Sequence, residues 1–161
     1  MRDMITLQKI NDRFAEQLVE IMNVDEPLRL ALEMGETRII IDEFLTHNAE
    51  WVDSRSGDLF AIVLDDAAIG SISLSHQDRL QCEARIGYWL TSIYWGRGYT
   101  GQAFRLVLDY AQQQGFQIVR SSIMEDNMAS LKIWERCGAE VRKNGDRYGV
   151  EIRLETWRKE H

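Results

Sequence analysis

Residues 94–101, Tyr-Trp-Gly-Arg-Gly-Tyr-Thr-Gly, constrain the fold of this chain more than any other stretch. They follow a strand-like run over 85–90 and lead directly into an amphipathic helix pattern. Three closely spaced glycines, Gly96, Gly98 and Gly101, let the backbone turn tightly and bring several N–H groups toward one ligand. The start of the following helix adds unpaired N–H donors and the positive end of the helix dipole. The sequence therefore predicts a main-chain cradle for a phosphate or pyrophosphate group.

A dinucleotide-binding turn is the rival interpretation of this motif. Gly96-Arg-Gly-Tyr-Thr-Gly101 satisfies the Gly-x-Gly-x-x-Gly spacing of that class of site. Such a turn belongs to an N-terminal βαβ unit, however, and the chain that follows this one is too short for a doubly wound sheet. The lysine of a Walker motif is also missing, so the sequence favours a different phosphate-binding fold.

Length and composition predict one globular domain over residues 1–161. Hydrophobic residues make up 45% of the chain, Pro27 is the single proline, and no Gly/Ser/Pro-rich linker divides the sequence. Neither a run of about 18 apolar residues nor a signal-peptide core is present, so we expect no membrane partner and a cytoplasmic location. Cys82, Cys137 and the histidines lack metal-ligand or redox spacing, so no metal site is expected.

The formal net charge of −7 argues against nucleic acid as a direct partner and favours a cationic substrate. The alternative is that the negative charge only keeps the protein soluble. Charge alone therefore leaves the substrate open.

Hydrophobic periodicity predicts an alternation of strands and helices. In chain order it predicts a strand over 4–10, a helix to about residue 22, a helix over 36–47, strands over 59–64, 68–74 and 83–91, a helix over 99–114, a strand over 117–123, a helix from Asp126 or Asn127 to Cys137, and strands over 139–143 and 147–155. Gly115 and Gly138 suit helix ends, and Asn144-Gly145 is typical of a hairpin turn. This order predicts an α/β (α+β) domain around one mixed, mostly antiparallel sheet flanked by about four helices.

Three motifs, in this order and spacing, resemble the GCN5-related N-acetyltransferases (GNAT superfamily). They are Ile86-Gly-Tyr-Trp-Leu90, Tyr94-Trp-Gly-Arg-Gly-Tyr99 and Asp126-Asn-Met-Ala-Ser130. The resemblance spans nearly the whole chain and is strongest to the branch that acetylates the N-termini of ribosomal proteins (RimJ/RimL type). It implies the acyl-CoA N-acyltransferase fold, acetyl-CoA as cosubstrate, no metal, and a protein N-terminus or a small polyamine as the amine acceptor.

The resemblance also implies which residues hold the cofactor. The family's pyrophosphate signature, Gln/Arg-x-x-Gly-x-Gly/Ala, falls on Trp95, Gly98 and Thr100, so two of its three positions depart from the consensus. The main-chain N–H groups still supply the donors, and Arg97 either contacts a phosphate or is only solvated. The implied cofactor-binding residues are Trp89, Leu90, Thr91, Ser92, Trp95, Gly96, Arg97, Gly98, Tyr99, Thr100, Gly101, Asn127 and Trp134.

In the family, the strand before the cradle splays at a bulge and offers a main-chain N–H to the acetyl carbonyl. By position this donor is Trp89 or Leu90, and Gly87 is consistent with the bulge, although a glycine kept for packing is an equal alternative. Asn127 matches an asparagine that contacts the cofactor, and it also has the position of a helix cap. Both roles are compatible with the sequence.

Moving an acetyl group from a thioester to an amine requires a neutral amine, a donor for the oxyanion and a proton for the departing thiolate. Many members of the family place a tyrosine seven residues after the asparagine, but here that position is Trp134. Ser130 is therefore the candidate acid, with water as the fallback. Glu83 is the candidate base, directly or through water, although an ion pair with Arg85 is the favoured alternative.

The acceptor is the least determined feature. A lysine-like amine of pKa about 10.4 costs roughly 4–5 kcal/mol to neutralise at pH 7, whereas an α-amine near 8 costs about 1. The lack of an obvious strong base therefore favours a protein N-terminus, with a polyamine or other small amine as the alternative. Because the usual tyrosine is missing, a non-catalytic CoA-binding sensor stays open. Trp51, Trp157 and the segment 24–36 either shape an acceptor pocket or only pack, and a homodimer is compatible with the sequence.

Overall fold

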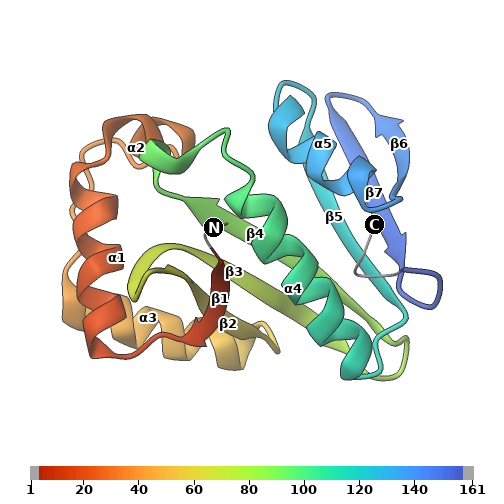
Figure 1. Ribbon diagram of the computed structural model, residues 1–161, viewed down its shortest axis with the longest axis horizontal. Coiled ribbons are helices and arrows are strands. Elements are labelled where there is room, and N and C mark those ends of the chain that lie inside the picture. The colour runs from red at the N-terminus through yellow and green to blue at the C-terminus, as the bar shows by residue number, and fades with distance from the viewer. Residues whose placement is uncertain (1–3, 158–161) are drawn as a thin grey trace.

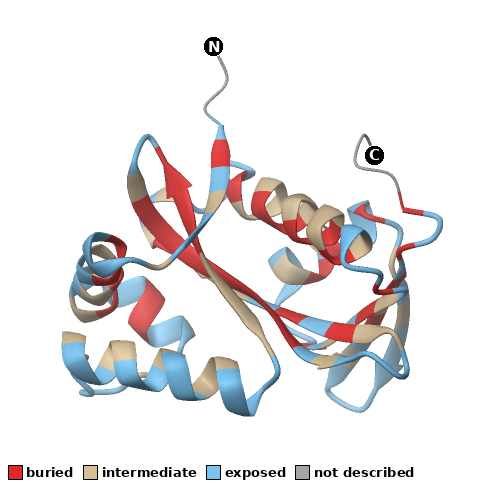
Figure 2. Ribbon diagram, turned by 90° about the horizontal axis from the view of Figure 1, so that it is seen from below, coloured by how far each residue is buried: buried red, intermediate tan, exposed pale blue. Residues whose placement is uncertain are grey.

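Residues 4–157, which the computed structural model describes, form one seven-stranded sheet with helices on both faces (Figure 1, Figure 2). The sheet has the order β1-β2-β3-β4-β5-β7-β6, and the strands are β1 Ile5–Lys9, β2 Asp58–Leu64, β3 Ala67–Asp78, β4 Glu83–Leu90, β5 Ile118–Met124, β6 Glu140–Asn144 and β7 Arg147–Arg153. Neighbouring strands are antiparallel except β4 and β5, which run parallel. The predicted α/β class with a mixed, mostly antiparallel sheet is confirmed.

The described residues form five helices, one more than predicted. They are α1 Asp12–Val24, α2 Glu26–Ala31, α3 Ile41–Ser54, α4 Tyr99–Gln113 and α5 Met128–Arg136, with a short 3₁₀ turn η1 Ser92–Tyr94. Helices α1 and α3 cover one face of the sheet, and α4 and α5 cover the other (Figure 2). None of these helices is both long and apolar enough to cross a membrane.

The sheet separates two hydrophobic clusters. The smaller cluster joins α1 to β2 and β3 through Phe14, Leu18 and Ala61. The larger cluster lies under α4 and α5 and includes Phe104 and Trp134, whose rings meet edge to face with centroids 4.9 Å apart. Burial of these large side chains on both faces is the main stabilisation of the sheet that carries the site.

Helix α2 was missed because Pro27 reads as an interruption of the helical pattern. Pro27 instead lies in the first turn of α2, where its missing N–H costs no hydrogen bond. The Asp25 side chain caps this helix by accepting the Leu28 N–H at 3.2 Å. The segment 24–36 therefore contains a short capped helix rather than only a variable loop.

The helix predicted over 36–47 begins and ends later than expected, since α3 spans Ile41–Ser54. The Asn23 side chain accepts the Ile39 N–H at 2.8 Å and donates to the Ile39 carbonyl at 2.9 Å. Both backbone groups of Ile39 are thereby bonded outside any helix. This long-range contact overrides the local periodicity, so the apolar pair 39–40 precedes the helix.

Strands β4 and β5 part after three paired positions. The parallel pairs are Glu83 with Ile118, Ala84 with Val119 and Arg85 with Arg120, and no pair follows along β4. On its other side, β4 stays in register with β3 through to the pair Gly70–Leu90. The predicted splay of β4 is therefore confirmed.

Of the two interpretations of Gly87, a bulge or a glycine kept for packing, the bulge is wrong. Gly87 pairs regularly with Ser73, and the register shift between β3 and β4 lies further along, between Ser75 and Asp78. The strands part because β5 diverges, whereas β4 continues beside β3.

Candidate active site

The glycine turn lies between η1 and α4, at the carboxyl end of β4 (Figure 1). Gly96 has φ of 75° and Gly98 has φ of 85°, a left-handed conformation that glycine adopts without steric cost. Gly98 is the N-cap of α4 and has no side chain to cap it. The Gln102 N–H donates to the Gly98 carbonyl at 3.1 Å, which is the first hydrogen bond of the helix. The amides that precede Gln102 in α4 have no partner within the helix, as an anion cradle requires.

Three side chains of this segment, Trp95, Arg97 and Tyr99, already have contacts within the protein. The Arg97 guanidinium lies over the Tyr94 ring, 5.5 Å from its centroid. The Trp95 Nε1 donates to the Leu90 carbonyl at 2.7 Å. Tyr99, 8% exposed, packs edge to face against Tyr94 and belongs to the core. The cradle is therefore a main-chain feature, with Arg97 placed at its side.

Asp25 joins α2 to the end of β4. Its Oδ2 accepts the Thr91 hydroxyl at 2.8 Å and the Ser92 N–H at 2.7 Å, and its Oδ1 accepts the Ser92 hydroxyl at 2.6 Å. Burial opposes ionisation of Asp25, but the hydrogen bonds from Ser92, Thr91 and Leu28 outweigh it and lower the pKa of the carboxyl. Thr91 and Ser92, expected along the cofactor, thus have hydrogen-bond partners within the protein.

Along β4, the main-chain N–H groups point alternately toward β3 and into the gap beside β5. The Thr91 N–H donates to the Ile69 carbonyl at 2.8 Å, so this N–H points toward β3. By the two-residue period, Trp89 also directs its N–H toward β3, whereas Tyr88 and Leu90 direct theirs into the gap. Trp89 is therefore a wrong candidate for the N–H donor to the acetyl carbonyl, and Leu90 has the required direction.

Tyr88 and Ser130 meet across this gap. The Tyr88 hydroxyl hydrogen-bonds to Ser130 Oγ at the first turn of α5, and Asn127 caps the same turn by accepting the Ser130 N–H at 3.2 Å. Burial raises the pKa of Tyr88, and the hydrogen bonds with Ser130 and Trp134 only partly offset that rise. The phenol therefore stays protonated at neutral pH and can donate a hydrogen bond.

On the opposite face of the sheet lies a cavity of 290 Å³, hereafter the α3 pocket. It is lined by Phe44, Asn48 and Trp51 of α3 and by Leu59, Ser71, Ser73, Gly87, Tyr88 and Trp89 of the sheet. Gly87 has no side chain, so the part of the pocket beside β4 is open. The Asn48 Nδ2 is buried without a hydrogen-bond partner among residues 4–157. The Trp89 side chain thus faces this pocket, away from α4.

The sequence matches the family model for the acetyltransferase (GNAT) domain over residues 5–140. The chain belongs to the GNAT acetyltransferase family. Among curated proteins, it is 34% identical over 76 residues to the probable N-acetyltransferase YjcK of Bacillus subtilis (strain 168), a match that covers 46% of this chain. The same match spans 42% of the length of that relative.

Solved structures of the family share the whole fold. RimJ of Mycobacterium smegmatis, in complex with CoA-disulfide, matches with a TM-score of 0.79 and 19% identity over 94% of this chain and 82% of its own. Spermidine N-acetyltransferase of Vibrio cholerae, in complex with CoA and spermine, matches with a TM-score of 0.77 and 14% identity over 94% of this chain and 96% of its own. At these identities the likeness concerns the fold.

The remaining predicted residues of the GNAT site are placed as follows. Ser130 and Asn127 lie together at the start of α5, facing the gap beside β4. Gly96–Gly101 form the turn and helix start, as predicted. Trp134 is 1% exposed and belongs to the core, which leaves its indole no surface for a ligand.

Glu83 lies in the paired part of β4, before the strands separate. Its carboxylate forms an ion pair with Arg120 at 3.0 Å, and Arg120 also binds Glu151 at 3.1 Å. The prediction that Glu83 pairs with Arg85 is therefore wrong, because Glu83 pairs with Arg120 on the adjacent strand β5 instead of the arginine on its own strand. From Glu83 to Tyr88 the strand advances about 16 Å, so Glu83 is distant from the hydroxyl pair of Tyr88 and Ser130.

Trp51 lines the α3 pocket, whereas Trp157 is buried in the larger core cluster. Within residues 4–157, no three His, Cys, Asp or Glu side chains come close enough to hold a metal ion. Sequence reasoning missed Tyr88 as a functional candidate. The motif Ile86-Gly-Tyr-Trp-Leu90 contained the signal, since even-numbered residues of that strand face α4 and α5.

Proposed function

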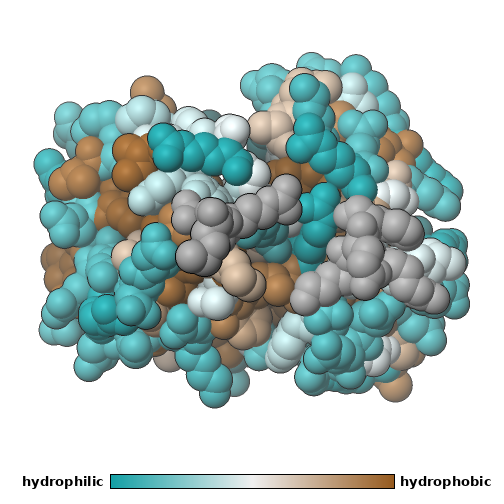
Figure 3. Space-filling model, viewed as in Figure 1, coloured by the Kyte–Doolittle hydropathy of each residue, from teal (hydrophilic) through white to brown (hydrophobic). Residues whose placement is uncertain are grey.

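We propose that this GNAT protein is an acetyl-CoA-dependent N-acetyltransferase whose acceptor is a protein N-terminal α-amine, attacking directly within a ternary complex. The observation that carries the proposal is the parting of β4 and β5 beside the Tyr88–Ser130 pair, next to the glycine turn. Donors for a diphosphate, main-chain groups for an extended arm and a hydroxyl pair for the reacting end thus follow one another along one opening. In the space-filling view the molecule is indented between its α2 and α5 sides (Figure 3).

The residues present fit acetyl-CoA. The amides of the Gly98–Gly101 turn would hold the diphosphate, with Arg97 adding a charge-assisted contact. The Leu90 N–H, directed into the gap, would bind the acetyl carbonyl and stabilise the oxyanion. The Asn127 Nδ2 stays available to the ligand while its Oδ1 caps α5. Bound CoA in the RimJ and spermidine N-acetyltransferase structures supports this assignment.

Tyr88 and Ser130 take the place of the family's usual tyrosine. The Tyr88 and Ser130 hydroxyls are hydrogen-bonded to each other. With Tyr88 as the donor of that bond, the Ser130 proton would be free to reach the departing sulfur. The nitrogen–carbon bond forms as the carbon–sulfur bond breaks, and the thiolate takes the Ser130 proton while the amine proton leaves to water. Tyr88 then replaces the proton of Ser130 and is itself reprotonated from solvent.

The α3 pocket favours a peptide N-terminus over a polyamine. None of its nine lining residues is acidic, so nothing in it would pair with the several ammonium groups of a polyamine. The unpartnered Asn48 Nδ2 is a donor that suits a peptide carbonyl oxygen, and a polyamine has no such acceptor. A polyamine is the second candidate, supported by the net charge of −7 and by the fold of the spermidine enzyme.

Cofactor binding is tested by the thermal shift with acetyl-CoA in Gly98→Glu and in a matched control, Gly115→Glu. Both glycines have left-handed φ, 85° and 90°, and at both positions a Cβ would meet no atom within 4 Å. The strain of substitution is therefore equal, but only Gly98 lies in the cradle. We expect the shift to vanish in Gly98→Glu alone; equal shifts in both variants would refute the cradle.

The acceptor is tested by thiol release with an N-terminally free peptide, the same peptide blocked at its N-terminus, and spermidine. We expect release only with the free peptide, reduced about 100-fold by Tyr88→Phe at unchanged KM, since acid catalysis contributes about 10²- to 10⁴-fold. Release with spermidine instead would establish the polyamine alternative. Cofactor binding without release for any amine would establish the non-catalytic sensor.

A further inference from the structure

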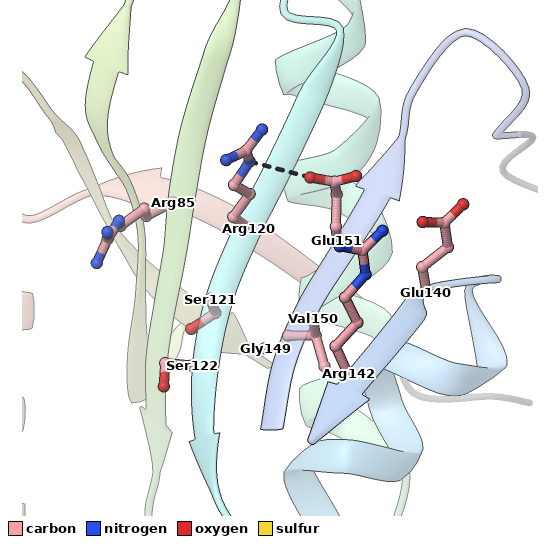
Figure 4. Close-up of a pocket in the computed structure, with 9 residues that line it drawn as sticks. All are labelled: Arg85, Arg120, Ser121, Ser122, Glu140, Arg142, Gly149, Val150 and Glu151. Carbon is pink, nitrogen blue, oxygen red and sulfur yellow. Dashed lines mark ion pairs between the residues drawn. The ribbon is translucent and has the colours of Figure 1, made fainter. Parts of the chain in front are cut away.

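A second cavity lies on the same face of the sheet as the α3 pocket. This arginine pocket has a volume of 390 Å³ and spans β4, β5, β7 and β6 (Figure 4). The residues that matter are Arg85, Arg120, Ser122, Arg142, Gly149 and Glu151. Register places them on one face, because Ser122 pairs with Gly149, Gly149 with Arg142, and Arg120 with Glu151.

The lack of a side chain at Gly149 leaves the centre of the arginine pocket open. Gly149 lies between Ser122 and Arg142 in the sheet, and as a glycine it contributes no side chain to the face that the neighbouring strands line. A Cβ at Gly149 would lie 3.8 Å from the Arg142 carbonyl oxygen, an ordinary contact. A larger side chain can therefore fill the pocket without straining the strand, which provides a clean blocking variant.

The charges of the pocket are only partly neutralised. Arg120 is bound by Glu83 and Glu151, as the dashed line to Glu151 in Figure 4 shows. The guanidinium groups of Arg85 and Arg142 make no hydrogen bond or ion pair with any residue between 4 and 157. Glu140 is the one carboxylate of the lining without an ion pair among those residues. The lining therefore contains two cations, Arg85 and Arg142, and one carboxylate, Glu140, that take no part in these ion pairs.

The positive charge of Arg85 also acts on His76 of the neighbouring strand β3. Burial and the positive charges of Arg85 and Arg55 lower the pKa of His76, beside the start of β4. The pocket is thus locally positive in a chain whose net charge is −7. Arginine forks bind carboxylates in bidentate geometry, so the chemistry that fits is a carboxylate.

The arginine pocket adjoins the proposed acceptor site. Arg85 and Gly87 are neighbours on one face of β4, and the gap beside Tyr88 opens between the two pockets. At Arg85 and Arg120, the last pair of β4 and β5, two strand spacings of about 10 Å separate β4 from β7. An extended peptide rises about 3.3 Å per residue, so a chain whose amine lies beside β4 would bring its fourth residue over β7.

We propose that the arginine pocket binds a carboxylate side chain at the fourth residue of the acceptor peptide, through Arg85 and Arg142. This inference rests on the proposed function, in which the acceptor is a protein N-terminus. It assigns the protein a preference for N-termini that carry an acidic residue shortly after the acetylated position. Glu140 limits that preference, because its carboxylate competes for Arg142.

The test compares kcat/KM for two peptides that differ only by Asp or Asn at the fourth position. We expect wild type to prefer the Asp peptide about fivefold, the amount that corresponds to one partly exposed ion pair of about 1 kcal/mol. Arg142→Gln and Gly149→Val should abolish the preference, and Glu140→Gln should increase it. Arg136→Gln, which removes the same charge from α5 on the other face, is the matched control and should change nothing.

Equal kcat/KM for the two peptides in wild type would overturn the inference, and so would a preference that Arg142→Gln leaves intact. A lack of acetylation of both peptides would refute the proposed function instead, so the two failures are distinguishable. Thermal melting of each variant checks the fold. Arg85→Gln should also reduce the preference for the Asp peptide, which tests the second arginine separately.

Discussion

Replacing Asp25 with alanine tests whether one carboxylate fixes the end of β4, where the cradle begins. The substitution removes four hydrogen bonds, from the Thr91 hydroxyl, the Ser92 N–H and hydroxyl, and the Leu28 N–H. It therefore removes both the cap of α2 and the connection between α2 and the loop that follows β4. No other described side chain joins these two segments through as many bonds.

The expected loss in the free energy of unfolding is about 3 kcal/mol. Removing a helix cap costs about 1 kcal/mol. Thr91 is 6% exposed, so its hydroxyl loses its partner without gaining water, which costs about 1–3 kcal/mol. Ser92 is only half-buried and its polar groups can turn to water, and the desolvation cost of the carboxylate is removed with it, so these terms add about 1 kcal/mol or less.

The same contacts predict a pH dependence. Because the pKa of Asp25 is lowered on folding, its contribution to stability is fully present above the ordinary carboxyl pKa of about 3.9. The contribution is lost as the pH falls through the lowered folded value. The difference in stability between wild type and Asp25→Ala should therefore be largest near pH 7 and should shrink in acid.

Urea unfolding at pH 7 and in acid measures both effects. Asn11→Ala is the control, since Asn11 caps α1 through a single bond to the Phe14 N–H at 2.8 Å and should cost about 1 kcal/mol. Equal losses for the two variants at pH 7 would show that Asp25 is only a helix cap. A loss for Asp25→Ala that persists unchanged in acid would refute the role assigned to its charge.

Two further substitutions test the framework of the site by urea unfolding. Gly70→Ala should cost about 3 kcal/mol, because its Cβ would collide with the Trp89 carbonyl oxygen and lie 2.9 Å from the Leu90 Cα. The control Gly87→Ala, whose Cβ would meet only Ser73 Oγ at 3.5 Å, should cost under about 1 kcal/mol. Similar losses for the two variants would refute the close approach of β3 and β4. Arg29→Lys should cost about 2 kcal/mol, because the buried guanidinium donates to the carbonyls of Met22, Gly35 and Thr37 at 2.7, 3.0 and 2.6 Å and an ammonium lacks that forked geometry. The control Arg38→Lys, at an exposed arginine, should cost under about 0.5 kcal/mol. Equal losses for the two variants would contradict this reasoning.

Local signals predicted the strands and the cradle well. Each of the seven strands lies where an apolar run or a hairpin signal predicted it, and the glycines that require positive φ, Gly96, Gly98, Gly115, Gly138 and Gly145, all adopt it. These features depend on side-chain alternation and on backbone conformation at single positions. Both are properties of a few consecutive residues, which is why the sequence contains them.

Contacts between distant segments account for the differences. Asn23 holds Ile39 out of α3, and Asp25 binds the side chains of Thr91 and Ser92, a contact that the sequence did not predict. Glu83 pairs with Arg120 rather than Arg85 because β5 lies beside β4. No periodicity within one segment encodes such a partner.

The sequence by itself determined the order of the elements, the glycine turn before α4 and the family to which the chain belongs. Only the tertiary structure decided that Tyr88 meets Ser130, that Trp89 faces the α3 pocket, and that Gly149 opens a hollow among arginines. The physical reason is that a strand fixes the side to which each residue points, but only its neighbours decide what lies there. The proposed site lies where β5 separates from β4, because the residues that meet there come from strands and helices far apart in the sequence.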